Sequence, residues 1–142
     1  MFRLATKIIS ALVLAAAFTA PAKAFNFIGF DAQCDDARVL RVITGKFAHQ
    51  VRHVPHLPDV RIVSFDHVHE RRFVPASKAT HTMISRRYCQ ATAHMSDGHR
   101  RSVWYMIEDG MGFAGKFGDG VQFCVAGFDR WKVYNAWCRV VR

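Results

Sequence analysis

Two runs of alternating residues flank the dipeptide Asp97-Gly98, and this stretch constrains the fold more than any other part of the sequence. Asp-Gly between such runs is the strongest short-range signal for a β-hairpin, because glycine accepts the positive φ of a tight turn. We predict two antiparallel strands joined by this dipeptide, with Ser96 opposite His99. That register puts small residues opposite larger ones on one side of the sheet: Ala93, Ala91 and Cys89 oppose Ser102, Trp104 and Met106.

One long helix is predicted ahead of the hairpin, over residues 31–54. Its apolar residues recur at steps of three and four, which places them on one stripe: Leu40, Ile43, Phe47, Val51 and Val54. Asp31, Asp35 and Asp36 lie at its start, where the helix dipole favours negative charge. Cys34 falls in its predicted first turn, and Pro55 ends the helix.

The rest of the chain is predicted to form strands and loops. Residues 25–30 are predicted to form an apolar arm, and residues 71–78 are predicted to form a loop. Strands are expected over residues 60–69, 121–126 and 132–141. Residues 80–84 are expected to extend the first strand of the hairpin, and residues 108–120 to form a glycine-rich loop. A helix with one apolar stripe must cover a sheet, so the fold class is α+β: one N-terminal helix packed on a four- to five-stranded antiparallel meander. In outline this two-layer domain is like a cystatin or a nuclear-transport-factor domain.

An export signal is predicted over residues 1–24. A short positively charged region precedes an apolar run over residues 8–18, and Ala22 and Ala24 present the small side chains that a signal peptidase reads. Cleavage is expected after Ala24, which leaves residues 25–142 as a single domain. The alternative is an uncleaved membrane anchor, but the apolar run is short beside the roughly 20 residues of a spanning helix.

Four cysteines follow the predicted cleavage point: Cys34, Cys89, Cys124 and Cys138. An even number in an exported chain favours two disulfides, for which three connectivities are open. Cys124 and Cys138 flank one predicted hairpin, so the favoured pairs are Cys124 with Cys138 and Cys34 with Cys89. The alternative is a zinc site of four thiolates, which usually holds its cysteines in pairs about two to four residues apart. No two cysteines here are that close.

The C-terminal half of the chain resembles a known family. The residues that carry the resemblance are 87–98, 103–108, 112–115, 121–131 and Cys138-Arg139. They look like a family of small exported bacterial proteins of unknown function, over residues 34–142. The family pattern includes all four cysteines, which implies structural bridges. The family has no known activity, so the resemblance assigns no catalytic residue.

Histidine is frequent, with 8 residues, and all of them follow the predicted leader. His49 and His53 are spaced i, i+4 on the predicted helix, and His67 and His69 fall on one face of a predicted strand. These four are candidate ligands for zinc or copper. However, His49 and His53 lie opposite the apolar stripe, and no carboxylate or cysteine completes a set at a known spacing. A periplasmic metal-binding protein is therefore one alternative hypothesis.

Catalytic residues are not assigned. Residues 110–115 match G-x-G-x-x-G, but residues 116–120 do not begin the helix that a dinucleotide site requires. Glu108 and Asp109 are adjacent, so on a strand they point to opposite faces and cannot flank one bond. No Gly-x-Ser-x-Gly elbow is present. A hydrolase acting on the envelope remains an alternative, because active sites assemble from distant residues.

The charge balance favours anionic partners. Removal of the leader takes away Arg3, Lys7 and Lys23 and leaves 17 basic residues against 11 acidic ones, a net charge of +6. Basic pairs and aromatic residues suggest contact with an acidic polymer: Arg71-Arg72, Arg86-Arg87 and Arg100-Arg101, with Trp104, Tyr105, Trp131 and Trp137. The alternative is that these aromatics belong to the core.

These observations predict a small periplasmic or secreted domain with a binding or structural role in the bacterial envelope. The partner is expected to be an anionic envelope component or another protein. No cofactor, nucleic acid or membrane span after cleavage is expected.

Overall fold

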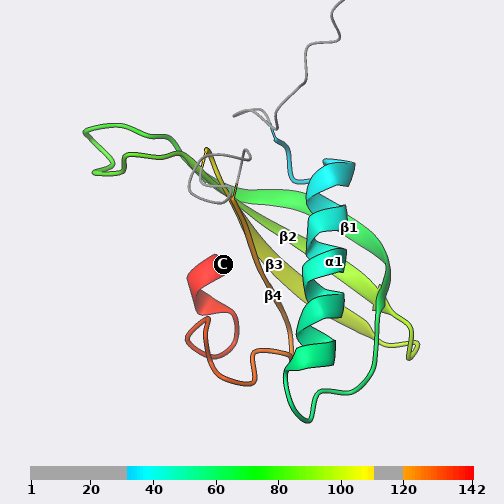
Figure 1. Cartoon of the computed structure of the whole chain (residues 1–142). Coiled ribbons are helices and arrows are strands. Elements are labelled where there is room, and N and C mark those ends of the chain that lie inside the picture. The colour runs from blue at the N-terminus through cyan, green and yellow to red at the C-terminus, as the bar shows by residue number, and fades with distance from the viewer. Residues whose placement is uncertain (1–31, 111–119) are drawn as a thin grey trace, which may run out of the picture.

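The computed structural model describes residues 32–110 and 120–142. The leader, its cleavage point at Ala24, the apolar arm and residues 111–119 of the glycine-rich loop lie outside them. The described residues confirm the α+β fold: one helix, α1 (Ala37–His53), packs against a four-stranded antiparallel sheet (Figure 1). None of their helices is both long and apolar enough to cross a membrane.

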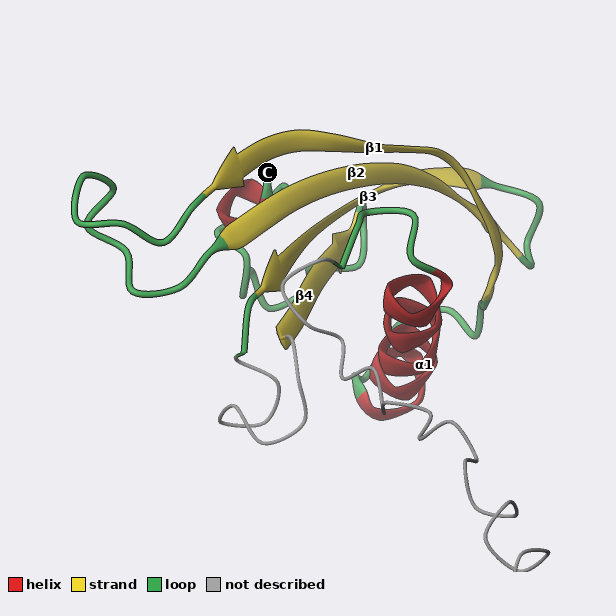
Figure 2. Cartoon of the chain, turned by 90° about the horizontal axis from the view of Figure 1, so that it is seen from above, coloured by secondary structure: helices red, strands yellow, loops and turns green. Residues whose placement is uncertain are grey.

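The sheet is a meander in which neighbours in sequence are neighbours in space. Its strands are β1 (Ile62–Val74), β2 (Arg86–Met95), β3 (Arg100–Glu108) and β4 (Gly120–Val125), in the order β1-β2-β3-β4. Figure 2 shows the strands arching over α1, so the helix lies in the hollow of a curved sheet.

Helix α1 is shorter than predicted, because it begins at Ala37 rather than at residue 31. The Asp36 carboxylate accepts a hydrogen bond from Arg38 N–H (2.8 Å), so Asp36 is the N-cap. Cys34 therefore precedes the helix instead of lying in its first turn. The predicted stripe is largely confirmed, since the buried helix residues are Val39, Ile43, Phe47 and Val51.

The hairpin is present, but its predicted register is wrong by one residue. Met95 N–H donates to His99 O (2.9 Å) and Gly98 N–H to Met95 O (3.0 Å), so the loop has three residues instead of two. Gly98, with φ 81°, supplies the left-handed residue that ends such a loop. A slip of one residue exchanges the faces of a strand.

The exchange changes which side chains of β3 form the core. Cys89 opposes Tyr105 and Ala91 opposes Val103, and these four residues are buried on the helix side. Small residues still meet large ones, as predicted. Trp104, however, points to the opposite face of the sheet, where it packs against a second apolar cluster.

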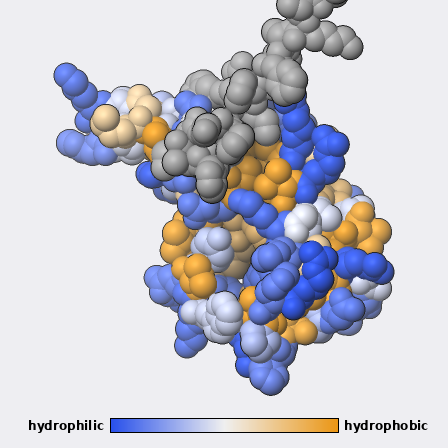
Figure 3. All heavy atoms as spheres, in the orientation of Figure 1, coloured by the Kyte–Doolittle hydropathy of each residue, from blue (hydrophilic) through white to orange (hydrophobic). Residues whose placement is uncertain are grey.

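Strand β1 continues through residues predicted as a loop. Three register shifts interrupt its pairing with β2, and His67 has a φ of 51° at one of them. Such bulges explain the imperfect alternation of the sequence and increase the twist of the strand. Residues 80–84, predicted to extend β2, lie instead in a projecting loop (Figures 1 and 3), where Met83 is 95% exposed.

The Cys34–Cys89 disulfide fastens the segment before α1 to the second strand. Beside it, the buried Tyr105 hydroxyl donates to the Cys34 carbonyl at 2.6 Å. Burial, and then the negative charge of Asp35, raise the pKa of Tyr105, so the phenol stays protonated as a donor. The disulfide and this hydrogen bond thus both hold the segment before α1.

We expect Tyr105→Phe to lower the free energy of unfolding by about 1–3 kcal/mol, because it leaves the buried Cys34 carbonyl without its donor. The pKa of Tyr105 is higher in the folded state than in the unfolded state. The stabilisation that the Tyr105 hydroxyl provides is therefore complete below about pH 10 and is lost as the pH rises further. Urea unfolding of both proteins at increasing alkaline pH measures this. An equal alkaline loss of stability in Tyr105→Phe would contradict the assignment.

The predicted last strand over residues 132–141 is wrong. These residues form turns and end in a short 3-10 helix, η2 (Arg139–Val141). Asn135, Ala136, Trp137 and Cys138 all have φ between 48° and 57°, which no strand accommodates. The segment crosses to the sheet face opposite α1 (Figure 1), where Tyr134 and Val141 cover Met106 and Cys124.

Candidate functional site

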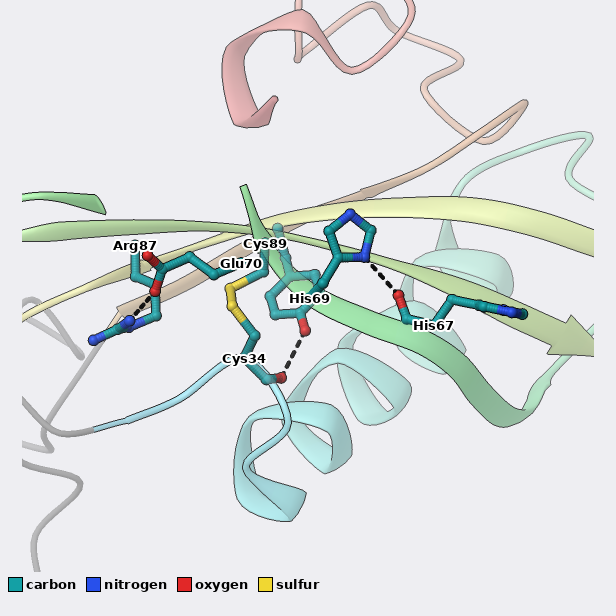
Figure 4. The surroundings of a disulfide bond; sticks show 7 residues. Cys34, His67, His69, Glu70, Arg87 and Cys89 are labelled. Carbon is teal, nitrogen blue, oxygen red and sulfur yellow. Dashed lines mark hydrogen bonds and ion pairs between the residues drawn. A yellow bond between two sulfur atoms is a disulfide. The ribbon is translucent and has the colours of Figure 1, made fainter. Parts of the chain in front are cut away.

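The histidines proposed as metal ligands do not form a site in the described part of the chain. His49 and His53 lie on the exposed face of α1, where their rings stack at a centroid distance of 3.9 Å. His67 and His69 lie on β1, and the Nδ1 atom of His69 is 2.8 Å from the His67 carbonyl (Figure 4). No group of three potential ligands is present among residues 32–110 and 120–142.

Two other histidines form local pairs with carboxylates. The His94 Nε2 atom contacts a carboxylate oxygen of Asp66 across β1 and β2, and this hydrogen bond is the main cause that lowers the pKa of Asp66. His99 is paired with Asp97 in the hairpin turn, where its backbone N–H chiefly lowers the pKa of that carboxyl. Each of these histidines thus contacts one exposed carboxylate.

The cysteines form the two favoured disulfides, Cys34–Cys89 and Cys124–Cys138. No cysteine of the described residues is free. In this oxidised form they cannot act as zinc ligands or as nucleophiles, since both roles require a thiolate.

The most distinctive surface is formed by residues 126–142, which we call the C-terminal surface. Its backbone leaves β4 at Gly127, whose φ is 86°. Phe128 then returns to the main core, where its ring meets Phe47 edge-on at 5.0 Å. The Gln50 side chain donates to the Phe128 carbonyl (2.9 Å). The start of the surface is thereby fixed to α1.

A left-handed turn shapes the end of the C-terminal surface. Four consecutive residues, Asn135 to Cys138, have positive φ, and each non-glycine residue in this conformation costs about 1–2 kcal/mol. The Cys124–Cys138 disulfide holds the turn against the sheet. Such strain persists only where the surrounding structure imposes it, and it is concentrated at functional sites.

Large apolar side chains are exposed on this surface. Trp131 is 64% exposed and Trp137 73%, beside Val133 at 67% and Val140 at 52%. Aromatic residues of this size dominate the energetics of interfaces and are normally covered. Their exposure in one short segment indicates a binding surface.

Cationic side chains surround these aromatics. Residues 126–142 contain Arg130, Lys132, Arg139 and Arg142 but only one acidic residue, Asp129. Both Asp129 carboxylate oxygens lie 3.3 Å from Tyr134 N–H, so this acid already accepts a hydrogen bond from the turn. The surface is therefore rich in donors and positive charge.

Two pockets open on the C-terminal surface and share Asp129 and Arg130 in their walls. The first, of about 230 Å³, lies between α1 and the surface, and Trp131 lines it. The second, of about 330 Å³, includes Trp104 and Trp137 in its lining. The two exposed indoles thus belong to different pockets.

Trp104 lines the second pocket and carries a buried donor. The Nε1 atom of Trp104 is buried and has no hydrogen-bond partner among the described residues. The guanidinium of Arg142 lies over the Trp104 ring, 4.2 Å from its centroid. Buried donors without partners are rare, which sets Trp104 apart from the other residues that line this pocket.

The sequence identified only part of this surface. Trp131 and Trp137 were predicted as candidates, whereas Tyr105 belongs to the core. Most arginines of the predicted basic pairs contact other parts of the protein. Arg86 forms an ion pair with Glu108, and Arg87 forms one with Glu70. Arg72 stacks on Tyr88, and Arg101 stacks on Phe128. The cations at the pockets were missed because they are single residues between the aromatics rather than Arg-Arg pairs.

Comparison with protein-family models, with curated proteins and with solved structures finds no match for this chain.

Proposed function

We propose that this chain is an exported binding domain that holds an anionic polymer of the bacterial envelope through its C-terminal surface. The observation that carries the proposal is the exposure of Trp131 (64%) and Trp137 (73%) beside pockets lined by cations. A cation and an exposed aromatic face together suit a ligand with a negative group and an apolar or ring surface.

Export is supported by the predicted leader and by the two disulfides, which persist in oxidising compartments. The resemblance to small exported bacterial proteins points to the same compartment. With residues 1–24 removed, the net charge of +6 adds long-range attraction to an anionic matrix.

The shape of the surface favours a polymer with rings over a lipid bilayer. Membrane-binding surfaces insert a continuous apolar face into the interface, whereas here Trp131, Val133 and Trp137 alternate with charged or polar residues around two concave pockets. A chain of sugar rings can place one ring against an indole and its charged groups on the neighbouring cations.

Purified bacterial sacculi, which are insoluble and anionic, are the probe for this proposal. We expect the exported protein to co-sediment with them, and the bound fraction to fall as salt is raised, because exposed charges are screened. We expect Trp131→Ala/Trp137→Ala to reduce the bound fraction at least fivefold, since each indole contributes about 1 kcal/mol or more at such contacts.

The matched control is Val63→Ala/Met83→Ala, which removes two exposed apolar residues (70% and 95%) from outside the C-terminal surface. It is expected to bind like the parent. Equal binding by the double tryptophan variant would refute the proposal. Retention on phosphatidylglycerol vesicles but not on sacculi would replace the polymer with a lipid partner.

A further inference from the structure

The second pocket has a more specific chemistry than the surface around it. Its lining includes three cations, Arg130, Lys132 and Arg142, and one carboxylate, Asp129, that already accepts from the backbone. The pocket therefore has three cationic donor side chains against one carboxylate, so it suits a negatively charged ligand group that accepts hydrogen bonds, such as a carboxylate or a phosphate.

The aromatic part of the lining specifies the rest of the ligand. Trp104 and Trp137 both line the pocket, and Trp137 is 73% exposed, so its ring face is open. An indole face stacks well on a flat, weakly polar surface such as the face of a sugar ring. The volume of about 330 Å³ equals roughly ten water molecules at about 30 Å³ each, enough for a single sugar ring with its charged group.

We propose that the pocket between Trp104 and Trp137 binds one acidic sugar residue, with the ring on Trp137 and the carboxylate or phosphate at Arg142 and Lys132. This inference rests on the proposed function and names the unit of the polymer that is recognised. When the ligand enters, the Arg142 side chain moves from the Trp104 ring to the anion.

Calorimetric titration with digalacturonate, its neutral dimethyl ester, glucose 6-phosphate, inorganic phosphate and AMP tests the inference. We expect the acidic sugars to bind at least tenfold more tightly than the neutral methyl ester, which keeps the ring but loses the charge. Inorganic phosphate should also bind at least tenfold more weakly than glucose 6-phosphate, because it lacks a ring to stack. The better of the two acidic sugars identifies carboxylate or phosphate as the natural group.

Two pairs of variants separate the pocket from general charge and hydrophobicity. Trp137→Ala and Arg142→Gln are each expected to weaken binding of the better acidic sugar about tenfold. Their controls, Trp131→Ala and Arg139→Gln, remove the same side-chain types from outside this pocket and should change the affinity less than twofold. Circular dichroism of each variant verifies that the fold is kept.

Several outcomes would overturn the inference. Equal affinity for digalacturonate and its methyl ester would exclude an anion site, and equal losses in Arg142→Gln and Arg139→Gln would reduce the effect to net charge. Tighter binding of AMP than of either acidic sugar would assign the pocket to a nucleotide. If the protein is retained on sacculi but binds neither acidic sugar, the inference fails and the proposed function stands; if it binds neither sacculi nor sugar, both fail.

Discussion

Replacing Cys34 and Cys89 together by alanine is expected to lower the free energy of unfolding by about 4 kcal/mol and Tm by on the order of 15 °C. The disulfide closes a sequence separation of 55 residues, so its loss restores much entropy to the unfolded chain. It also joins the segment before α1 to the middle of the sheet, where Cys89 is fully buried. Urea denaturation followed by far-UV circular dichroism measures the loss.

Removing both cysteines avoids a free thiol that could mispair, so the effect reports the crosslink itself. A second variant, Cys34→Ser/Cys89→Ala, should be destabilised at least as much, because it adds a hydroxyl to the buried position 34. Unfolding of the double alanine variant at the same urea concentration as the parent would contradict this account of how the helix is held.

Replacing Cys124 and Cys138 together by alanine is expected to abolish binding while the helix and the sheet remain folded. Retention on sacculi should fall to background, and affinity for an acidic sugar should fall at least tenfold. The left-handed turn costs about 1–2 kcal/mol per residue over four residues, and without the crosslink that strain is relieved by opening the C-terminal surface. Co-sedimentation and calorimetry measure the loss of binding.

The two disulfide variants serve as controls for each other. Cys34→Ala/Cys89→Ala, studied below its reduced Tm, should bind like the parent, because residues 126–142 are fastened through Cys138 and Phe128. Near-parental far-UV circular dichroism of Cys124→Ala/Cys138→Ala would show that its loss of binding is not general unfolding. Undiminished binding by this variant would mean that the turn is not needed for the site.

The fold was predictable from the sequence because its signals are local. The spacing of Ile43, Phe47 and Val51 predicts a helix with one buried stripe, and those residues are buried in α1. Asp97-Gly98 predicts the hairpin but not its loop length, since Gly98 with positive φ fits both a two-residue and a three-residue loop. The antiparallel meander was therefore predicted correctly, but the side chains of β3 were assigned to the wrong faces of the sheet.

The C-terminal surface was not predictable in the same way. The residues after Lys132 are rich in β-branched and aromatic side chains, as a strand would be, but β-strand propensity is a weak guide against tertiary contacts. The apolar far face around Met106 and Cys124 instead draws Tyr134, Cys138 and Val141 across the sheet. The pairing of Cys124 with Cys138 was right although the reason, a flanking hairpin, was wrong.

The most direct test of the account is an NMR titration of ¹⁵N-labelled protein comprising residues 25–142 with the better-binding acidic sugar. We predict that shifts concentrate on the indole N–H groups of Trp104 and Trp137 and on backbone amides of residues 126–142, with the exposed faces of α1 and β1 unchanged. Shifts centred on His49 and His53, on β1, or spread evenly over all basic residues would contradict the claim that the C-terminal surface is the binding site.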